Sequence, residues 1–173
     1  MNEQERAALL GELEQGKADI LRAVDGVTEE MAARSTSLQR WSILECVEHI
    51  ATSEDYLFGQ ILVAHPSDAP TASAKRESAI RARGLDRTQK VPAPEVVKPA
   101  GEFSSLREAL KRFLAARERT IRYVETCQED LRSQITTHPI VGPVNCYETL
   151  LMMAMHPMRH ARQIEEVKSK IGS

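Results

Sequence analysis

Hydrophobic residues recur every three to four positions along four long segments of the chain, which is the spacing of one face of an α-helix. The segments cover about 3–24, 42–65, 105–126 and 145–168. In the first, Leu9, Leu13, Ile20 and Val24 lie near one face and charged residues lie on the other. The pattern predicts an all-α fold, a four-helix bundle formed by residues 1–173 as a single domain.

Local sequence patterns mark where three of these helices begin. Ser42 followed by Glu45 fits a capping box, in which each side chain accepts a hydrogen bond from a backbone amide that the helix leaves unpaired. Two further starts of this kind are Ser105 with Glu108 and Asn145 with Glu148. These patterns support the helix boundaries that the hydrophobic spacing predicts.

A long connection, 66–101, separates the second and third helices. A link of this length is unusual in a compact bundle and predicts a crossover or a lid. Its middle, 74–83, is expected to form a short helix. Between Lys75 and Lys90 it holds six basic residues and two acidic ones. Such a segment is either a solvated surface or a basic rim that attracts an anionic substrate.

Composition and charge exclude several classes of protein. Aromatic residues make up only 4% of the chain, whereas Ala, Leu, Glu, Arg and Met, which favour helices, are abundant. A net charge of −2 gives no electrostatic basis for binding nucleic acid or an anionic membrane. No apolar run is long enough to cross a bilayer, and the polar N-terminus is unlike a secretory signal. Three cysteines without a CxxC pair indicate a reducing compartment, so we expect a cytoplasmic protein.

Two histidines in the fourth helix are the first candidates for chemistry. His156 and His160 lie four residues apart, so they share one face and are separated by about 6 Å along the axis. Two imidazoles at this spacing can bind one metal ion, as in HExxH metalloproteases, but no glutamate follows His156. Their face also carries Thr149, Met152, Met153 and Gln163, so it is expected to point inward. Pro157 predicts a kink beside them.

A third ligand would have to come from another helix, and His49 in the second helix is the candidate. The residues on its side of that helix are polar, namely Ser42, Glu45, Thr52, Ser53, Tyr56 and Gln60. Residue type alone slightly favours a stripe that faces solvent over one that faces inward and brings His49 to a metal site. His65 and His138 each precede a proline and are poorer ligands. Three neutral imidazoles would leave open coordination positions, which is typical of catalytic metal sites.

Two stretches of the chain resemble the DinB/YfiT-like superfamily. Residues 41–49, WSILECVEH, resemble the W-S-x-x-E-x-x-x-H pattern that opens its second helix. Residues 138–143, HPIVGP, followed by 156–164, HPMRHARQI, resemble its last helix with H-x-x-x-H-x-x-Q-I; Pro157 is a departure from many relatives. The resemblance covers roughly residues 9–167. It implies a four-helix bundle that binds one divalent ion, zinc or nickel, through His49, His156 and His160.

The resemblance also implies a chemistry. Relatives in this superfamily are similar to S-transferases that use bacillithiol and to isomerases that use mycothiol. It therefore implies a metal-dependent thiol S-transferase, with a small-molecule thiol and an electrophile as its partners and a homodimer as one option for its assembly. A metal-dependent hydrolase and a non-catalytic metal- or ligand-binding bundle are the alternatives. DNA binding is not implied.

Four further side chains are lesser candidates. Glu45, one turn before His49, either orients the imidazole or serves only the capping box. Tyr56 and Gln163 lie on the faces of the histidines and either contact substrate or pack. Glu54 falls on the apolar side of its helix, so it should pair with an arginine.

Overall fold

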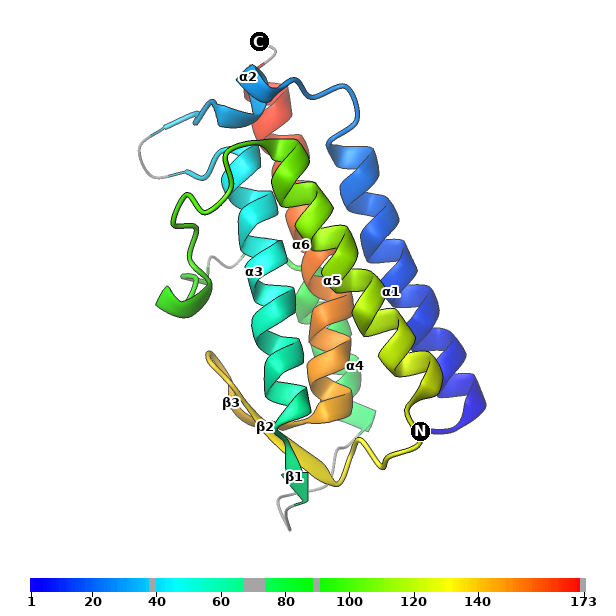
Figure 1. Cartoon of the computed structure of the whole chain (residues 1–173). Helices are drawn as coiled ribbons and strands as arrows, with labels where there is room; N and C mark the ends of the chain where they lie inside the picture. Colours follow the sequence, from blue (N-terminus) through cyan, green and yellow to red (C-terminus); the bar gives the residue numbers. More distant parts are fainter. Residues whose placement is uncertain (38–39, 67–73, 89–90, 172–173) are drawn as a thin grey trace.

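The computed structural model describes residues 1–37, 40–66, 74–88 and 91–171 (Figure 1). Four long helices run side by side: α1 (Glu3–Ala23), α3 (Ile43–Leu62), α5 (Leu106–Thr126) and α6 (Cys146–Ile171). They match the four predicted segments, and the four-helix bundle is confirmed. Two shorter helices, α2 (Glu29–Ala33) and α4 (Ala74–Leu85), and the 3-10 turn η1 (Glu95–Val97) lie in the connections. In the part of the chain described here, no helix is both long and apolar enough to cross a membrane.

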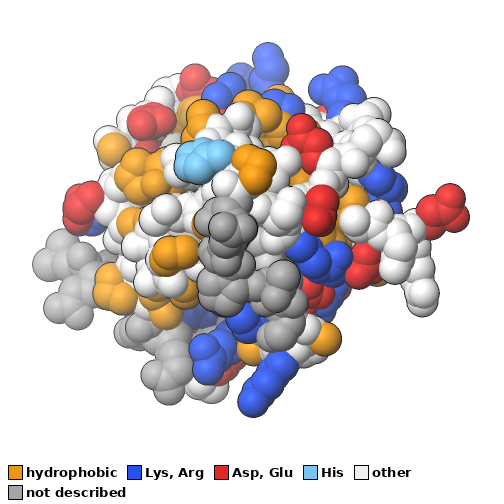
Figure 2. Space-filling view, turned by 90° about the horizontal axis from the view of Figure 1, so that it is seen from below, with side chains coloured by type: hydrophobic (Ala, Val, Ile, Leu, Met, Phe, Trp, Pro, Cys, Tyr) orange, Lys and Arg blue, Asp and Glu red, His pale blue; other side chains and the backbone are white. Residues whose placement is uncertain are grey.

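The expectation of an all-α chain is incomplete, because a small antiparallel sheet closes one end of the bundle. Its strands are β1 (His65–Pro66), β2 (Gln134–His138) and β3 (Gly142–Asn145), in the order β1-β2-β3. β2 and β3 form a hairpin whose turn ends at Gly142, with a φ of 75° that favours glycine. β1 continues from α3, so the sheet ties the end of α3 to the segment that leads into α6. Figure 2 shows this end, where hydrophobic side chains lie among basic and acidic ones.

Two of the predicted helix starts show how side chains cap the first turn of a helix. The amide of Glu148 donates to Asn145 Oδ1 (2.8 Å), and the Asn145 amide donates to Glu148 Oε2 (3.2 Å), which completes a capping box. At α5, Ser105 accepts from the Glu108 amide (3.1 Å). The Glu108 carboxylate bonds to Ser104 instead of Ser105, so this second box is only half formed.

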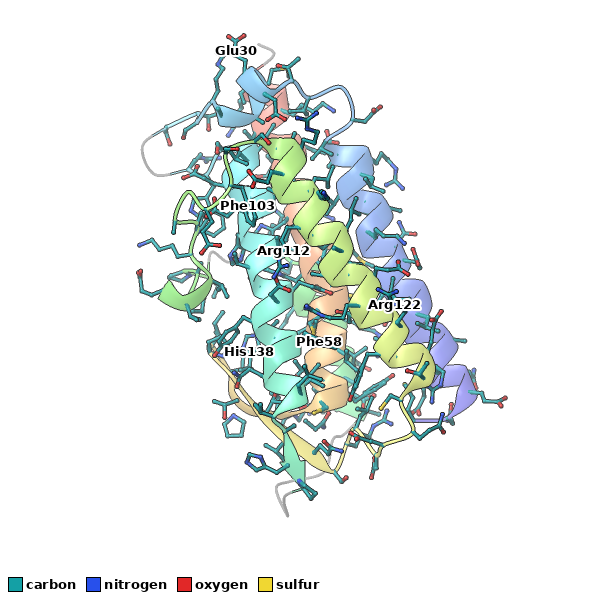
Figure 3. All side chains as sticks on the ribbon, viewed as in Figure 1. Glu30, Phe58, Phe103, Arg112, Arg122 and His138 are labelled. Atoms are coloured by element: carbon teal, nitrogen blue, oxygen red, sulfur yellow. The ribbon has the colours of Figure 1, made fainter. Side chains whose placement is uncertain are left out.

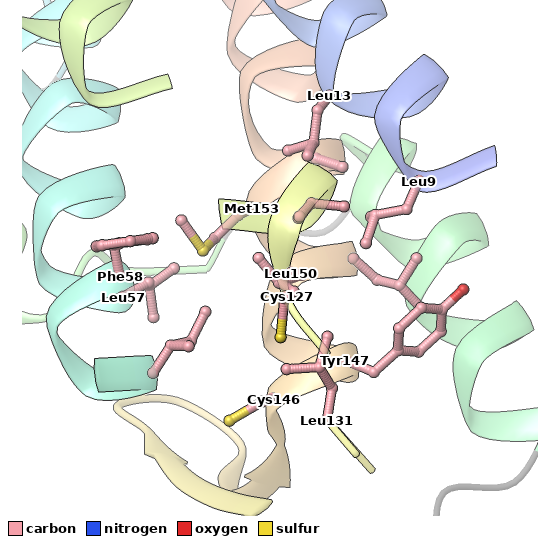
Figure 4. Packing of buried hydrophobic residues seen from close by; sticks show 14 of the residues in the cluster. Leu9, Leu13, Leu57, Phe58, Cys127, Leu131, Cys146, Tyr147, Leu150 and Met153 are labelled. Carbon is pink, nitrogen blue, oxygen red and sulfur yellow. The ribbon is translucent and has the colours of Figure 1, made fainter. Parts of the chain in front are cut away.

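Hydrophobic side chains fill the bundle in two clusters, one toward each end. The lower cluster, drawn in Figure 4, includes Leu9, Leu13, Leu57, Phe58, Leu150 and Met153. The upper cluster includes Ile20, Val24, Val47, Phe113 and Ile164. Along each long helix, the residues between the clusters are polar or small: Gly16 in α1, Ser53 and Glu54 in α3, Arg117 and Thr120 in α5, and His156 in α6. We call this the middle layer.

The described part of the long link at 74–88 lies along α6 as a strap, and three of its basic residues are paired with acidic ones. Arg76 contacts Glu148 (2.9 Å), Arg81 contacts Glu12 (2.6 Å) and Arg87 contacts Glu166 (2.8 Å). These pairs join α4 and the residues after it to α1 and α6. They neutralise much of the positive charge that a free basic rim would need. Lys90, the last base of the predicted segment, lies outside the described residues.

The contact between α4 and α6 depends on Gly84. A Cβ added to Gly84 would lie 2.5 Å from the Cβ of Met155, so Gly84→Ala should push α4 away from α6. Overpacking of this kind costs about 1–3 kcal/mol, and here it should appear as faster hydrogen exchange in α4. Gly11→Ala is the control, because its Cβ would meet nothing within 4 Å. Equal exchange in the two variants would contradict the prediction.

Candidate metal centre

Three histidines meet at the middle layer, two from α6 and one from α3. One ring nitrogen from each of His49, His156 and His160 lies within 4.8 Å of those of the other two. The Nε2 atoms of His49 and His156 are 3.1 Å apart. Two nitrogens bound at about 2.0–2.1 Å to one tetrahedral zinc would be about 3.3 Å apart, close to this separation. We call these three residues the histidine cluster.

The polar side of α3 does not face solvent, which corrects the slightly favoured interpretation of the sequence. Ser53 and His49 are buried, and Thr52, Tyr56 and Gln60 are half-buried. The turn η1 and strand β2 both contact α3. Segments far from α3 in the sequence therefore contribute to its burial, so residue type alone could not reveal it.

A backbone carbonyl orients His49. Its Nδ1–H donates to the carbonyl oxygen of Val97 in η1 (2.7 Å), which leaves the Nε2 lone pair facing His156. The buried carboxylate of Glu48 holds the segment just after η1, because its Oε1 accepts from the amides of residues 100–102 at 2.7, 2.9 and 3.1 Å. Sequence reasoning missed Val97, since a carbonyl has no residue signature. An acidic residue next to His49 was the only available hint.

Glu45 does not supply this orienting contact. Its Oε2 accepts from the Ser42 amide (2.7 Å), and the Glu45 amide donates to Ser42 Oγ (3.2 Å). The capping box is therefore confirmed. A carboxylate that oriented His49 would have to accept from its Nδ1–H, and this group is already bonded to the carbonyl of Val97. Tyr56 packs against the lower hydrophobic cluster, which agrees with the second of its two predicted roles, packing instead of substrate contact.

Gln163 links the histidine cluster to the strap. Its Oε1 accepts from Arg87 (3.1 Å), and, against the larger effect of burial, its side chain acts on His160 by raising the pKa of that imidazole. Arg87 also forms two bonds to Glu166. The Nδ1 atom of His160 is buried without a hydrogen-bond partner among the described residues. An unpartnered nitrogen in such a place is costly for the apo protein and suits a metal ligand.

Burial keeps the three imidazoles neutral. It lowers the pKa of His49, and it lowers the pKa values of His156 and His160 well below the usual value for histidine. Repulsion between the rings adds to the effect of burial on His156 and His160. A neutral imidazole has a lone pair free for a metal, so the cluster is ready to bind one at neutral pH.

The remaining two histidines lie outside the cluster. His65 is exposed in β1 and bonds to the carbonyl of Val63 (3.0 Å). His138 is the last residue of β2 (Figure 3), and its Nδ1 accepts from the amides of Ile140 and Val141. Trp41 lies against the cluster instead, with its ring centroid 4.8 Å from that of His49 and 6.1 Å from that of His160.

Comparison with known proteins agrees with this architecture. The chain is 25% identical over 146 residues to the uncharacterised protein YuaE of Bacillus subtilis, covering 84% of this chain and 88% of YuaE. Its fold is similar to that of YfiT from Bacillus subtilis, described as a probable metal-dependent hydrolase with an unusual four-helix bundle topology. That likeness has a TM-score of 0.64, 15% identity, and coverage of 99% of this chain and 90% of YfiT. Residues 12–164 match the DinB superfamily, and the chain belongs to that family.

Proposed function

We propose that the protein is an enzyme that holds one divalent ion with His49, His156 and His160 and activates a small nucleophile there. The observation that carries the proposal is the convergence of three neutral, mostly buried imidazoles, one with an unpartnered nitrogen. Imidazole ligands suit zinc and nickel among the available metals. Three protein ligands leave an open coordination position, as in catalytic zinc sites.

A thiol is the nucleophile that the surroundings favour. Among the described residues, the group of possible ligand atoms that lie within 4.8 Å of one another holds the three histidines and no carboxylate, so it supplies no acidic side chain as a base toward water. A bound metal would lower the pKa of a thiol without such a base. Besides burial, Arg159 lowers the pKa of His160, and its positive charge near the cluster favours an anionic donor, whereas the charge of Arg87 is balanced by Glu166. A thiol S-transferase is therefore our first hypothesis.

A hydrolase is the second candidate. YfiT, which shares the fold, is described as a probable metal-dependent hydrolase. In that case the open position would hold a water molecule instead of a thiol, and the metal would lower the pKa of that water. The histidine cluster would be the same in both cases.

One pair of assays separates the two candidates. Metal-loaded protein should accelerate the reaction of a small acidic thiol, such as bacillithiol or mycothiol, with 1-chloro-2,4-dinitrobenzene. The same protein should leave a p-nitrophenyl ester intact when thiol is absent. His49→Gln should abolish the first activity, whereas His65→Gln on the exposed strand β1 should not. Ester cleavage without thiol, together with no rate gain from any thiol, would replace the transferase by the hydrolase.

A further inference from the structure

Pro157 creates a gap in the hydrogen bonding of α6. The helix runs from Cys146 to Ile171 with Pro157 inside it. Because proline has no N–H, the carbonyl of Met153, four residues earlier, loses its helical donor. This carbonyl belongs to a buried residue next to the middle layer, where an unpaired backbone group is costly.

A buried arginine from α5 fills this gap. Arg117 Nη2 donates to the Met153 carbonyl at 2.7 Å. Its side chain is fully buried, and Glu54 from α3 balances its charge through a contact of 2.8 Å. The predicted arginine partner of Glu54 is therefore Arg117. Thr120 donates to the other carboxylate oxygen of Glu54 (2.8 Å).

The gap lies beside the histidine cluster. Met153 and Pro157 flank the stretch of α6 that contains His156, and Arg117 is bonded to the first of them. On the neighbouring helix, a Cβ added to Gly16 would lie 2.9 Å from the carbonyl oxygen of Ala154. The turn that carries His156 is thus held by Arg117 and packed closely against α1.

We propose that Glu54 and Arg117 position His156 by replacing the hydrogen bond that Pro157 removes from α6. The ion pair and the proline then act as one unit: Pro157 leaves the Met153 carbonyl without a helical donor, and Arg117, held by Glu54, supplies one. This inference rests on the proposed metal site for its functional meaning. In the competing explanation the ion pair only joins α3 to α5, and the effect of removing it does not depend on residue 157.

A double-mutant cycle distinguishes the two explanations. Glu54→Leu combined with Arg117→Met removes both charges, so no lone charge is left buried. The combination is made with and without Pro157→Ala, which returns an amide donor to the Met153 carbonyl. The dissociation constant and visible spectrum of bound Co²⁺ report on the site, and urea unfolding of the metal-free protein reports on stability.

Removing the ion pair should weaken Co²⁺ binding by about 10- to 100-fold, the usual effect of losing a group that orients a ligand, and should shift the Co²⁺ bands. In the Pro157→Ala background, removing the ion pair should change the Co²⁺ affinity and the Co²⁺ bands much less. Asp55→Asn with Arg112→Gln is the control, because Asp55, which is half-buried and also binds Arg119, joins the same two helices at the surface. Its effect should not depend on residue 157.

Equal losses with and without Pro157→Ala would overturn the inference. If the double replacement fails to fold, Arg117→Lys goes through the same cycle, since a lysine keeps the charge but cannot bridge Glu54 and Met153 in the same way. If the unaltered protein binds no Co²⁺, the proposed function fails instead. The unfolding free energies of the metal-free proteins then decide the inference: additive changes overturn it and non-additive changes support it.

Discussion

Replacing His156 with alanine is expected to abolish stable metal binding. His156 supplies the nitrogen that lies 3.1 Å from that of His49, and it shares one helix face with His160. Its loss would leave only two of the three ligands. Removing a residue that merely hydrogen-bonds to a ligand already lowers metal affinity by about 10- to 100-fold, so the loss of a ligand should lower it further. Protein purified without a histidine tag should carry one divalent ion per chain, and the variant should carry none above background.

The effect should also appear in stability. A ligand present at about 1,000 times its dissociation constant stabilises the folded state by about 4.1 kcal/mol, and this gain should vanish in His156→Ala. Trp41, the only tryptophan of the chain, lies against the cluster, so quenching of its fluorescence by Ni²⁺ gives an independent titration. His65→Ala and His138→Ala are the controls. Full metal content in the His156→Ala variant would show that the assignment of the histidine cluster is wrong.

The long helices were predictable because their information is local. The spacing of Leu9, Leu13 and Ile20 and the capping residues Ser42 and Asn145 act within a few residues of the chain, and the structure agrees at each of them. The hairpin of β2 and β3 was missed. Its strands are short, and β1 pairs with β2 across about seventy positions, a relation that periodicity cannot show.

The site was predictable to different degrees. The spacing of His156 and His160 predicts a shared face from sequence alone. His49 was a candidate by residue type, and only the resemblance favoured it as a ligand, because its helix side is polar. Its burial depends on η1 and β2, which are distant in the chain. The basic link shows the same limit: Arg81 and Arg87 pair with acids 69 and 79 residues away, so their charges could not be judged from the segment alone.

Acid is expected to destabilise the metal-free protein through the buried imidazoles. Burial lowers the pKa values of His156 and His160 in the folded state, whereas the unfolded chain has ordinary imidazoles with a pKa of about 6.5. Below about pH 6.5 the unfolded state therefore binds more protons than the folded state. Stability then rises with pH in this window, by up to about 1.4 kcal/mol per pH unit for each histidine, and levels off above it.

Urea unfolding between pH 5.5 and 7.5, in the presence of a chelator, tests this sign and avoids most carboxylate titration. The free energy of unfolding should fall as pH drops below about 6.5. His156→Gln with His160→Gln should flatten that fall, whereas His65→Gln on the exposed strand should leave it unchanged. The lowered pKa values also mean that metal affinity should persist below pH 6.5, the point at which ordinary imidazoles begin to lose it. Stability that increased toward pH 5.5 would mean that the cluster is protonated in the folded state, and the proposed metal site would then lose its electrostatic basis.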